Sequence, residues 1–186
     1  MTEPVFSKVL YGWMQWKVEK TVPECRKSII CVAPHTSNMD FFIAILYKWS
    51  IGLHSYFLMK RSWFFFPLGL LLKSIGGIPI DRSRHSHLTD YLADLLKSKE
   101  DMHIAITPEG TRSLNHNWKK GFYFIALKAG VPIQLYGIDY PKRLIVCTKQ
   151  IIPSGNLEAD MKEIRDYYGQ FKDTGRYPGK FALDEG

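Results

Sequence analysis

The chain has 186 residues, of which 46% are hydrophobic, 14% aromatic and 23% charged, proportions that are typical of one globular domain. This composition excludes a disordered protein, a collagen-like repeat and an extended coiled coil. The formal net charge is +7, and residues 41–80 contain no acidic residue. Such a charge favours an anionic partner, which leaves a nucleic acid, a membrane face and a phosphorylated small molecule as candidates.

Cysteine usage and the start of the chain indicate the compartment. The three cysteines, Cys25, Cys31 and Cys147, have neither the number nor the spacing of a disulfide framework or a zinc site. The first residues lack the features of a secretory signal. The uncharged apolar stretches are shorter than the roughly 18–20 residues of a membrane-spanning helix. We therefore expect a cytoplasmic protein that does not span a membrane. Its short apolar bursts between basic residues suit either a peripheral position on the inner face of the cell membrane or buried core helices.

The first predicted element is an amphipathic helix over residues 5–19. Apolar residues recur there at the spacing of one helical face, namely Val5, Val9, Leu10, Trp13 and Trp16. A face rich in tryptophan suits either a protein core or the interface of a bilayer. We expect residues 1–25 to form a membrane-associating segment around this helix.

Strands and helices then alternate along the chain. Short apolar runs rich in Ile and Val predict strands, and longer segments with a helical apolar period predict helices. The predicted strands cover residues 28–33, 55–59, 78–80, 102–107, 131–137 and 144–151. The predicted helices cover residues 39–50, 63–73, 85–99, 119–129 and 157–171. We therefore expect one α/β domain over residues 1–186, with a mostly parallel central sheet, flanking helices and a loose tail over residues 173–186.

Polar residues follow the first buried strand, in the run PHTSNMD at residues 34–40. In one continuous helix, His35 and Asp40 would lie about 140° apart, on opposite faces. Pro34 and the Thr-Ser-Asn turn instead place His35 at the strand end and Asp40 in the first helical turn, so the carboxylate can fold back to the imidazole. A carboxylate on one imidazole nitrogen leaves the other as a general base for a hydroxyl. The alternative is that Asp40 only favours the helix N-terminus.

Two further strand ends carry glycine and arginine. The run GGIPIDRSR at residues 76–84 places Arg82 after an apolar strand, where its guanidinium suits a ligand oxyanion or, equally, an acidic neighbour. The run TPEGTRS at residues 107–113 follows another apolar strand. There Gly110 permits a tight turn, and Arg112 supplies the forked donor that suits phosphate. This last run predicts a phosphate-binding loop, and the alternative is an exposed turn.

These blocks resemble, in order, the four motifs of the glycerolipid acyltransferase family, which includes the 1-acylglycerol-3-phosphate acyltransferases. The matching residues are PHTSNMD at 34–40, GGIPIDR at 76–82, TPEGTRS at 107–113 and GVPI at 130–133. Their order and spacing are more specific than any one block. The resemblance implies an O-acyltransferase of phospholipid biosynthesis. Such an enzyme moves a fatty acyl group from an acyl thioester to the hydroxyl of a lysophospholipid, here most directly 1-acylglycerol-3-phosphate, and the product is phosphatidic acid.

The resemblance also implies roles for residues. The catalytic pair would be His35 and Asp40. The residues binding the phosphorylated acceptor would be Arg82, Glu109, Gly110, Thr111 and Arg112. Those binding the acceptor or the acyl chain would be Val131, Pro132 and Ile133. Acyl-CoA or acyl-carrier protein would be the co-substrate, with no other cofactor and no metal, and we expect His85 and His87 to be surface residues rather than metal ligands.

Some positions depart from the family pattern. Pro34 stands where asparagine is common, and Pro79 and Thr107 stand where an aromatic residue is common. Because these positions flank the acceptor-binding loops, another lysolipid, such as an acylated amino-acid lipid, is an alternative acceptor. Many family members begin with a membrane-spanning helix. Here the membrane anchor is expected to be the N-terminal helix with its tryptophans, together with the basic aromatic stretch 41–80.

Direct transfer is the expected mechanism, with His35 taking the proton of the acceptor hydroxyl as it attacks the thioester. Covalent catalysis would need Ser37 or Cys31, but Ser37 is expected to cap a helix and Cys31 to lie in a buried strand. Two other classes of protein are alternatives. A non-catalytic lipid-binding protein would not need the pair of His35 and Asp40. A nucleic-acid-binding module would not need the glycine and arginine at the strand ends, so we expect no nucleic-acid partner.

Overall fold

The computed structural model describes residues 4–81 and 85–185. These residues form a seven-stranded sheet with the strand order β1-β7-β6-β2-β5-β3-β4. The strands are β1 (Lys17–Lys20), β2 (Lys27–Ala33), β3 (Ser55–Lys60), β4 (Gly77–Ile80), β5 (Met102–Ile106), β6 (Ile133–Asp139) and β7 (Leu144–Ile151). In this described sheet, β6 and β7 are antiparallel and the other neighbouring pairs are parallel. The predicted α/β fold with a mostly parallel sheet is confirmed.

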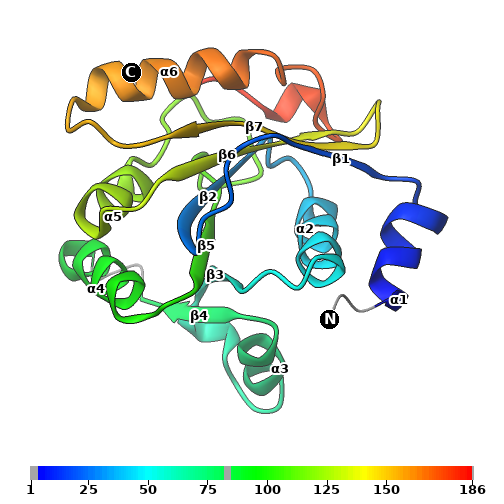
Figure 1. The fold of residues 1–186 in the computed structure, drawn as a ribbon, viewed down its shortest axis with the longest axis horizontal. Coiled ribbons are helices and arrows are strands. Elements are labelled where there is room, and N and C mark those ends of the chain that lie inside the picture. The colour runs from blue at the N-terminus through cyan, green and yellow to red at the C-terminus, as the bar shows by residue number, and fades with distance from the viewer. Residues whose placement is uncertain (1–3, 82–84, 186) are drawn as a thin grey trace.

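Helices cover both faces of the sheet (Figure 1). They are α1 (Pro4–Ser7), α2 (Asn38–Ser50), α3 (Leu68–Ser74), α4 (His85–Ser98), α5 (Gly121–Ala129) and α6 (Leu157–Gly169). A π-helical segment, Lys8–Trp13, continues α1, and 3-10 turns occur at Arg61–Trp63 and Pro178–Lys180. Because crossovers between parallel strands are right-handed, the strand order places α2 and α3 on one face and α4 and α5 on the other.

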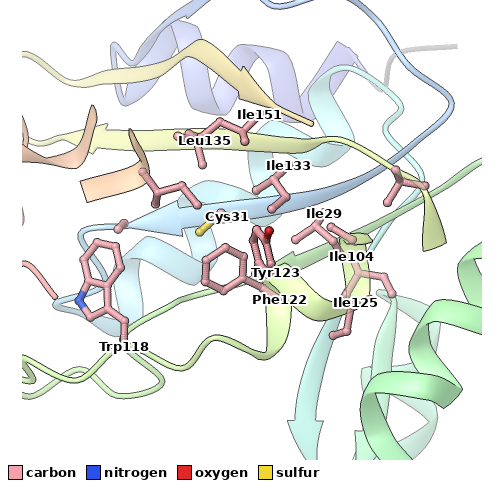
Figure 2. Packing of buried hydrophobic residues seen from close by; sticks show 14 of the residues in the cluster. Ile29, Cys31, Ile104, Trp118, Phe122, Tyr123, Ile125, Ile133, Leu135 and Ile151 are labelled. Atoms are coloured by element: carbon pink, nitrogen blue, oxygen red, sulfur yellow. The ribbon is translucent and has the colours of Figure 1, made fainter. Parts of the chain in front are cut away.

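The core consists of two apolar layers, one on each face of the sheet. Figure 2 shows Phe122 and Tyr123 of α5 beside Ile29 and Cys31 of β2, in the layer that also receives α4 and α6. The intervening Ile30 points to the other layer, where α2 packs. Successive residues of β2 are therefore buried on opposite faces, which is why its apolar run is uninterrupted rather than alternating.

One edge of the sheet collects the loops that follow the parallel strands. Ala33 of β2 pairs with Gly137 of β6, and Cys31 pairs with Ile106 at the end of β5. Lys60 of β3 pairs with Ile80 of β4, so these two strands also end together. The carboxyl ends of parallel strands are where α/β proteins usually bind ligands.

The N-terminal segment differs from the prediction. The helix ends at Trp13 rather than at residue 19, and residues Lys17–Lys20 form β1, which pairs with β7. Trp16 is buried and packs edge-on against Tyr140, with ring centroids 5.2 Å apart. The backbone hydrogen bonds offered by the edge of β7 outweigh the helical spacing of the apolar residues. Trp16 is therefore part of the core and unavailable as a membrane anchor.

The predicted helix over residues 63–73 is also shorter in the structure. α3 begins only at Leu68, and Pro67 precedes it as the residue at the helix N-cap. Proline lacks a backbone N–H and disfavours helical backbone in the residue before it, so the helix starts after it. Within residues 4–81 and 85–185, none of the helices has both the length and the apolar character needed to cross a membrane.

The C-terminal segment is packed rather than loose, up to the last described residue. Phe181 and Ala182 are buried in the structure. The Trp118 backbone N–H donates to Asp184 Oδ1 at 2.9 Å, and its indole N–H donates to the Ala182 carbonyl at 3.0 Å. The glycine and proline content of this segment gave a misleading signal, because its apolar side chains and one carboxylate have specific partners in the core.

Candidate active site

The predicted pair of His35 and Asp40 lies at the carboxyl end of β2. The strand ends at Ala33, His35 follows in the connecting loop, and Asp40 lies in the first turn of α2. His35 Nδ1 is 3.2 Å from Asp40 Oδ2, and the two side chains are 17% and 1% exposed. The expected approach of the carboxylate to the imidazole is confirmed. The other ring nitrogen, Nε2, faces away from the carboxylate.

The start of α2 explains why the carboxylate folds back. Ser37 is the N-cap, and its hydroxyl accepts a hydrogen bond from the Met39 N–H at 3.1 Å. Asp40 Oδ2 accepts hydrogen bonds from the N–H groups of Thr36 and Ser37, each at 2.8 Å. Together these bonds form a capping box. The same carboxylate oxygen caps the helix and contacts the imidazole, so the two interpretations of Asp40 do not exclude each other.

Tyr140 is a neighbour of this pair that sequence analysis missed. Its hydroxyl donates to Asp40 Oδ1 at 2.5 Å, so both carboxylate oxygens accept hydrogen bonds. Burial raises the pKa of Tyr140, and the hydrogen bond to Asp40 and the charge of Asp40 raise it further, so the phenol stays protonated as a donor. Tyr140 follows β6 and belongs to none of the four sequence blocks. It meets Asp40 only because β6 pairs in parallel with β2.

Glu109 supports the loop that carries His35. It follows β5, is 4% exposed, and accepts the His35 backbone N–H with both carboxyl oxygens, at 3.0 and 3.1 Å. Burial raises the pKa of Glu109 to about 8, the bond from the His35 N–H opposes this rise, and the charge of Asp40 adds to it. The carboxyl group that the resemblance assigns to acceptor binding thus contacts the backbone of the candidate base.

Replacing Glu109 with glutamine is expected to change how stability depends on pH. Burial raises the pKa of Glu109 from its ordinary value of 4.5 to about 8 in the folded chain. Between these values the unfolded chain loses this proton and the folded chain keeps it. The free energy of unfolding contributed by Glu109 therefore decreases as the pH rises through this range, and above it the loss is complete. Glu109→Gln removes this titration.

The measurement is urea denaturation of both proteins from about pH 5 to about pH 8. The free energy of unfolding of the wild type, relative to Glu109→Gln, should fall steadily across this range. Glu100→Gln, at an exposed position, controls for the loss of one carboxylate. A difference between wild type and Glu109→Gln that does not vary with pH would mean that Glu109 is already ionised in the folded protein.

The loop after Glu109 brings an arginine to the same place. Gly110 has a φ of +66°, a backbone conformation that side chains disfavour, and its N–H donates to the Thr107 carbonyl at 3.1 Å to close a tight turn. Thr111 and Arg112 follow on the surface. The Arg112 guanidinium donates a hydrogen bond to the side chain of Asn38, the first residue of α2. The predicted residues of this block therefore lie next to the pair of His35 and Asp40.

The structure does not bring all predicted residues together. Ile133 pairs with Ile29, at the start of β2, so Val131, Pro132 and Ile133 lie at the opposite edge of the sheet from His35. Val131 and Ile133 are buried there in the core. The predicted acceptor-binding residue Arg82 lies outside the residues that the structure describes.

The two possible nucleophiles near His35 are Ser37 and Cys31, and each has another place in the fold. The Ser37 hydroxyl is the helix cap described above. Cys31 is fully buried, and this burial raises the pKa of its thiol, which disfavours the reactive thiolate. Both observations agree with the expectation that the acyl group is not transferred through a covalent intermediate.

The C-terminal segment completes the surroundings of the His35 loop. The Tyr177 N–H donates to Thr36 Oγ1 at 3.3 Å. A Cβ atom at Gly175 would lie 3.0 Å from Thr36 Cγ2, so a larger residue there would have to displace the Thr36 side chain by a few tenths of an ångström. Burial is the largest influence on the Tyr140 pKa, but the charge of Arg176 opposes the rise, which puts a second guanidinium near the pair. Sequence analysis missed this segment because it predicted a loose tail.

Comparison with known proteins identifies the family of the chain. A family model described as Acyltransferase matches residues 15–138, more than half of the chain. No curated protein matches the chain. Among solved structures, the chain is similar to the 1-acyl-sn-glycerophosphate (LPA) acyltransferase PlsC from Thermotoga maritima, with a TM-score of 0.60 and 18% identity over 93% of this chain and 79% of that one. At this identity the likeness is one of fold. The family match, which spans His35, Asp40 and the loop to Arg112, shows that the chain belongs to the Acyltransferase family.

Proposed function

We propose that this acyltransferase moves a fatty acyl group from an acyl thioester, acyl-CoA or acyl-carrier protein, to the hydroxyl of a lysophospholipid. The acceptor we propose is 1-acylglycerol-3-phosphate, and the product is phosphatidic acid. The observation that carries the proposal is the contact between His35 Nδ1 and Asp40 Oδ2 at 3.2 Å, with Arg112 bound to the first residue of the same helix. This arrangement combines a base for a hydroxyl with a cation for a phosphate.

In the proposed reaction, His35 Nε2 takes the proton of the acceptor hydroxyl while the oxygen attacks the thioester carbonyl carbon. Asp40 holds the imidazole through Nδ1 and stabilises the imidazolium that forms. The tetrahedral intermediate collapses by breaking the carbon–sulfur bond, and the imidazolium returns its proton to the departing thiolate. The positive end of the α2 dipole, at Asn38, favours the negative charge that develops on the carbonyl oxygen.

Charge at the site supports a phosphorylated acceptor. Arg112 lies on the surface beside the N-terminus of α2, and the charge of Arg176 acts on the Tyr140 hydroxyl, which donates to Asp40. A guanidinium donates paired hydrogen bonds to a phosphate in a geometry that a lysine does not reproduce. We assign acceptor binding to Arg112, and we propose that Thr111 and Gly110 present the loop that carries it.

Replacing Arg112 with alanine is expected to weaken acceptor binding and leave the chemical step nearly intact. A lost charge-assisted hydrogen bond costs about 1.5–3 kcal/mol, which corresponds to a KM for 1-acylglycerol-3-phosphate raised by roughly 10- to 150-fold. An acceptor without a phosphate, such as a monoacylglycerol, should show no such change. Arg26→Ala, at an exposed position before the start of β2, is the matched control. An unchanged KM for the phosphorylated acceptor would refute the assignment of Arg112.

The test of the whole proposal is acyl transfer by the purified protein in detergent micelles. The assay offers labelled acyl-CoA or acyl-carrier protein with a panel of lysolipids, and His35→Ala is run alongside. Phosphatidic acid formed by the wild type and abolished in the variant supports the proposal. A faster product from an acylated amino-acid lipid would replace the proposed acceptor. Lysolipid binding in both proteins without product would favour a non-catalytic lipid-binding protein.

The lipid acceptor also sets where the enzyme works. A lysophospholipid is presented by a membrane surface, so we propose that the chain acts peripherally on the inner face of the cell membrane. This placement requires a part of the surface that meets the bilayer.

A further inference from the structure

Large apolar side chains are exposed around the start of α3. They are Trp63, Phe65, Phe66, Leu70 and Leu71, and each is more than half exposed, with Phe66 at 83%. We call these five side chains the α3 patch. Folded proteins rarely leave so many large apolar side chains exposed within one short segment unless that surface binds a partner.

Close contacts hold the backbone that carries the α3 patch. Phe64 turns inward, where its ring lies 3.2 Å from the position of a Cβ atom at Gly77. Gly69 packs so closely on the Phe64 backbone that a Cβ atom there would lie 2.8 Å from it. The Gly69 N–H donates to the Phe65 carbonyl at 2.6 Å. Because these contacts hold the backbone, Phe65 and Phe66 have a defined outward direction.

α3 itself presents a second apolar face. The helix buries Gly69 and Leu72, so the adjacent Leu70 and Leu71 point to solvent. A short helix that is apolar on both sides suits a boundary between protein and hydrocarbon better than a boundary with water.

Basic side chains flank the α3 patch. Lys60 and Arg61 precede it, Lys73 ends it, and all three are exposed. The chain from residue 41 to residue 80 contains no acidic residue. Apolar side chains between cations complement a bilayer with anionic headgroups, because the rings can enter the hydrocarbon while the cations contact the headgroups.

The α3 patch and the candidate active site lie on the same side of the fold. The loop with His35 follows the end of β2, and Arg61–Trp63 follows the end of β3, at the same edge of the sheet. α2 and α3 also share one face of the sheet (Figure 1). On the first turns of α2, Phe42 is exposed two residues after Asp40. A bilayer against this side would present a lipid hydroxyl toward the candidate base.

The described part of the N-terminal segment exposes three large apolar side chains, Val5, Tyr11 and Trp13, against five in the α3 patch. Trp16 and Leu10 are buried in the core, and Trp13 is the tryptophan that stays exposed, at 84%, within the described part of that segment. The N-terminal helix, which is expected to anchor the chain together with the stretch 41–80, therefore loses one of its two tryptophans as a membrane contact.

We propose that the α3 patch, with Lys60, Arg61 and Lys73 around it, is the surface that docks on an anionic lipid bilayer. Its side chains enter the headgroup and upper acyl region, and the three cations contact the anionic headgroups. The inference takes its lipid partner from the proposed function, but docking is measured without donor or acceptor. The two proposals therefore fail separately.

The first experiment is sedimentation with vesicles of equimolar phosphatidylcholine and phosphatidylglycerol. The triple variant Trp63→Ser, Phe65→Ser, Phe66→Ser should bind these vesicles roughly 100-fold or more weakly than the wild type, since each buried aromatic side chain is worth about tenfold or more. The control variant Phe124→Ser, Ile152→Ser removes exposed apolar side chains elsewhere and should bind like the wild type. Equal binding by the triple variant, or no binding by the wild type, overturns the proposal.

A second variant tests the contribution of the three cations around the α3 patch. Lys60→Gln, Arg61→Gln, Lys73→Gln should lose about fivefold in binding for each charge removed on the mixed vesicles, and should differ little from wild type on phosphatidylcholine alone. An equal loss of binding on the mixed vesicles and on phosphatidylcholine vesicles would overturn the role of the anionic headgroups.

A third experiment measures tryptophan fluorescence, and it does not require the triple variant to fold. The chain has five tryptophans, and brominated acyl chains quench those that enter the bilayer. Trp63→Phe should remove most of the quenching, and Trp13→Phe should remove little. The reverse pattern would assign docking to the N-terminal segment. In detergent micelles, where no bilayer is needed, the triple variant should keep its acyl transfer, so lost docking is distinguishable from lost catalysis.

Discussion

His35→Ala is expected to lower kcat by roughly a hundredfold to ten-thousandfold, the range that a positioned general base contributes. In the proposed reaction, the acceptor hydroxyl would then have to lose its proton to water. The fold should be retained, because Glu109 binds the backbone N–H of residue 35 rather than the imidazole. The measurement is steady-state acyl transfer in micelles, with the melting temperature of each protein determined in parallel.

The matched control for this substitution is His87→Ala, at an exposed position on α4. It should retain wild-type kcat and KM. A His35→Ala protein that folds and still turns over at the wild-type rate would rule out His35 as the base. The catalytic group would then have to be sought elsewhere at the same edge of the sheet.

Asp40→Ala is expected to lower both stability and activity. The substitution leaves the buried N–H groups of Thr36 and Ser37 and the Tyr140 hydroxyl without their acceptor. Loss of the helix cap and of buried hydrogen bonds should reduce the free energy of unfolding by about 3 kcal/mol or more. Activity should fall as well, because His35 Nδ1 loses the group that orients it. Urea denaturation and acyl transfer measure the two effects.

Asp40→Asn separates the capping role from the catalytic one. An amide oxygen in place of Oδ2 can still accept from the two N–H groups and from His35, while the amide nitrogen can donate to the Tyr140 oxygen. Stability should therefore stay close to wild type, but kcat should fall by about tenfold or more, because the charge that stabilises the imidazolium is gone. Tyr140→Phe should lie between Asp40→Asn and wild type. An Asp40→Asn protein with wild-type kcat would show that Asp40 only caps the helix.

The two buried carboxyl groups near His35 have different environments. Asp40 accepts hydrogen bonds from three donors other than His35, all within 2.8 Å. Glu109 receives the single N–H of His35 and is buried, which raises its pKa to about 8. Two neighbouring carboxyl groups can have different roles in one mechanism when their environments differ. The proposed mechanism uses the charge of Asp40 and the hydrogen-bonding capacity of Glu109.

The sequence by itself determined most of the strands and helices and the contact between His35 and Asp40. Apolar runs located β2, β5 and β6, because a strand buried on both faces needs apolar side chains at every position. The contact of His35 with Asp40 was also predictable. It depends on one strand end, one turn and one helix cap, all of which lie within a few residues along the chain.

The tertiary structure alone decided what surrounds that pair. Strand order brings Glu109 and Tyr140 to His35 from loops that are distant in the sequence, and it sends Val131–Ile133 to the far edge. The packing of the C-terminal segment and the burial of Trp16 were equally hidden. Within the stretch 41–80, expected to contribute to the membrane anchor, packing also decided which apolar side chains stay exposed. The periodicity of a segment reports which side chains seek burial, but the partner that buries them is chosen by contacts between elements far apart in the chain. The sequence therefore predicted the contact between His35 and Asp40, and the packing of the whole chain determined the residues that support this contact and the surface beside it.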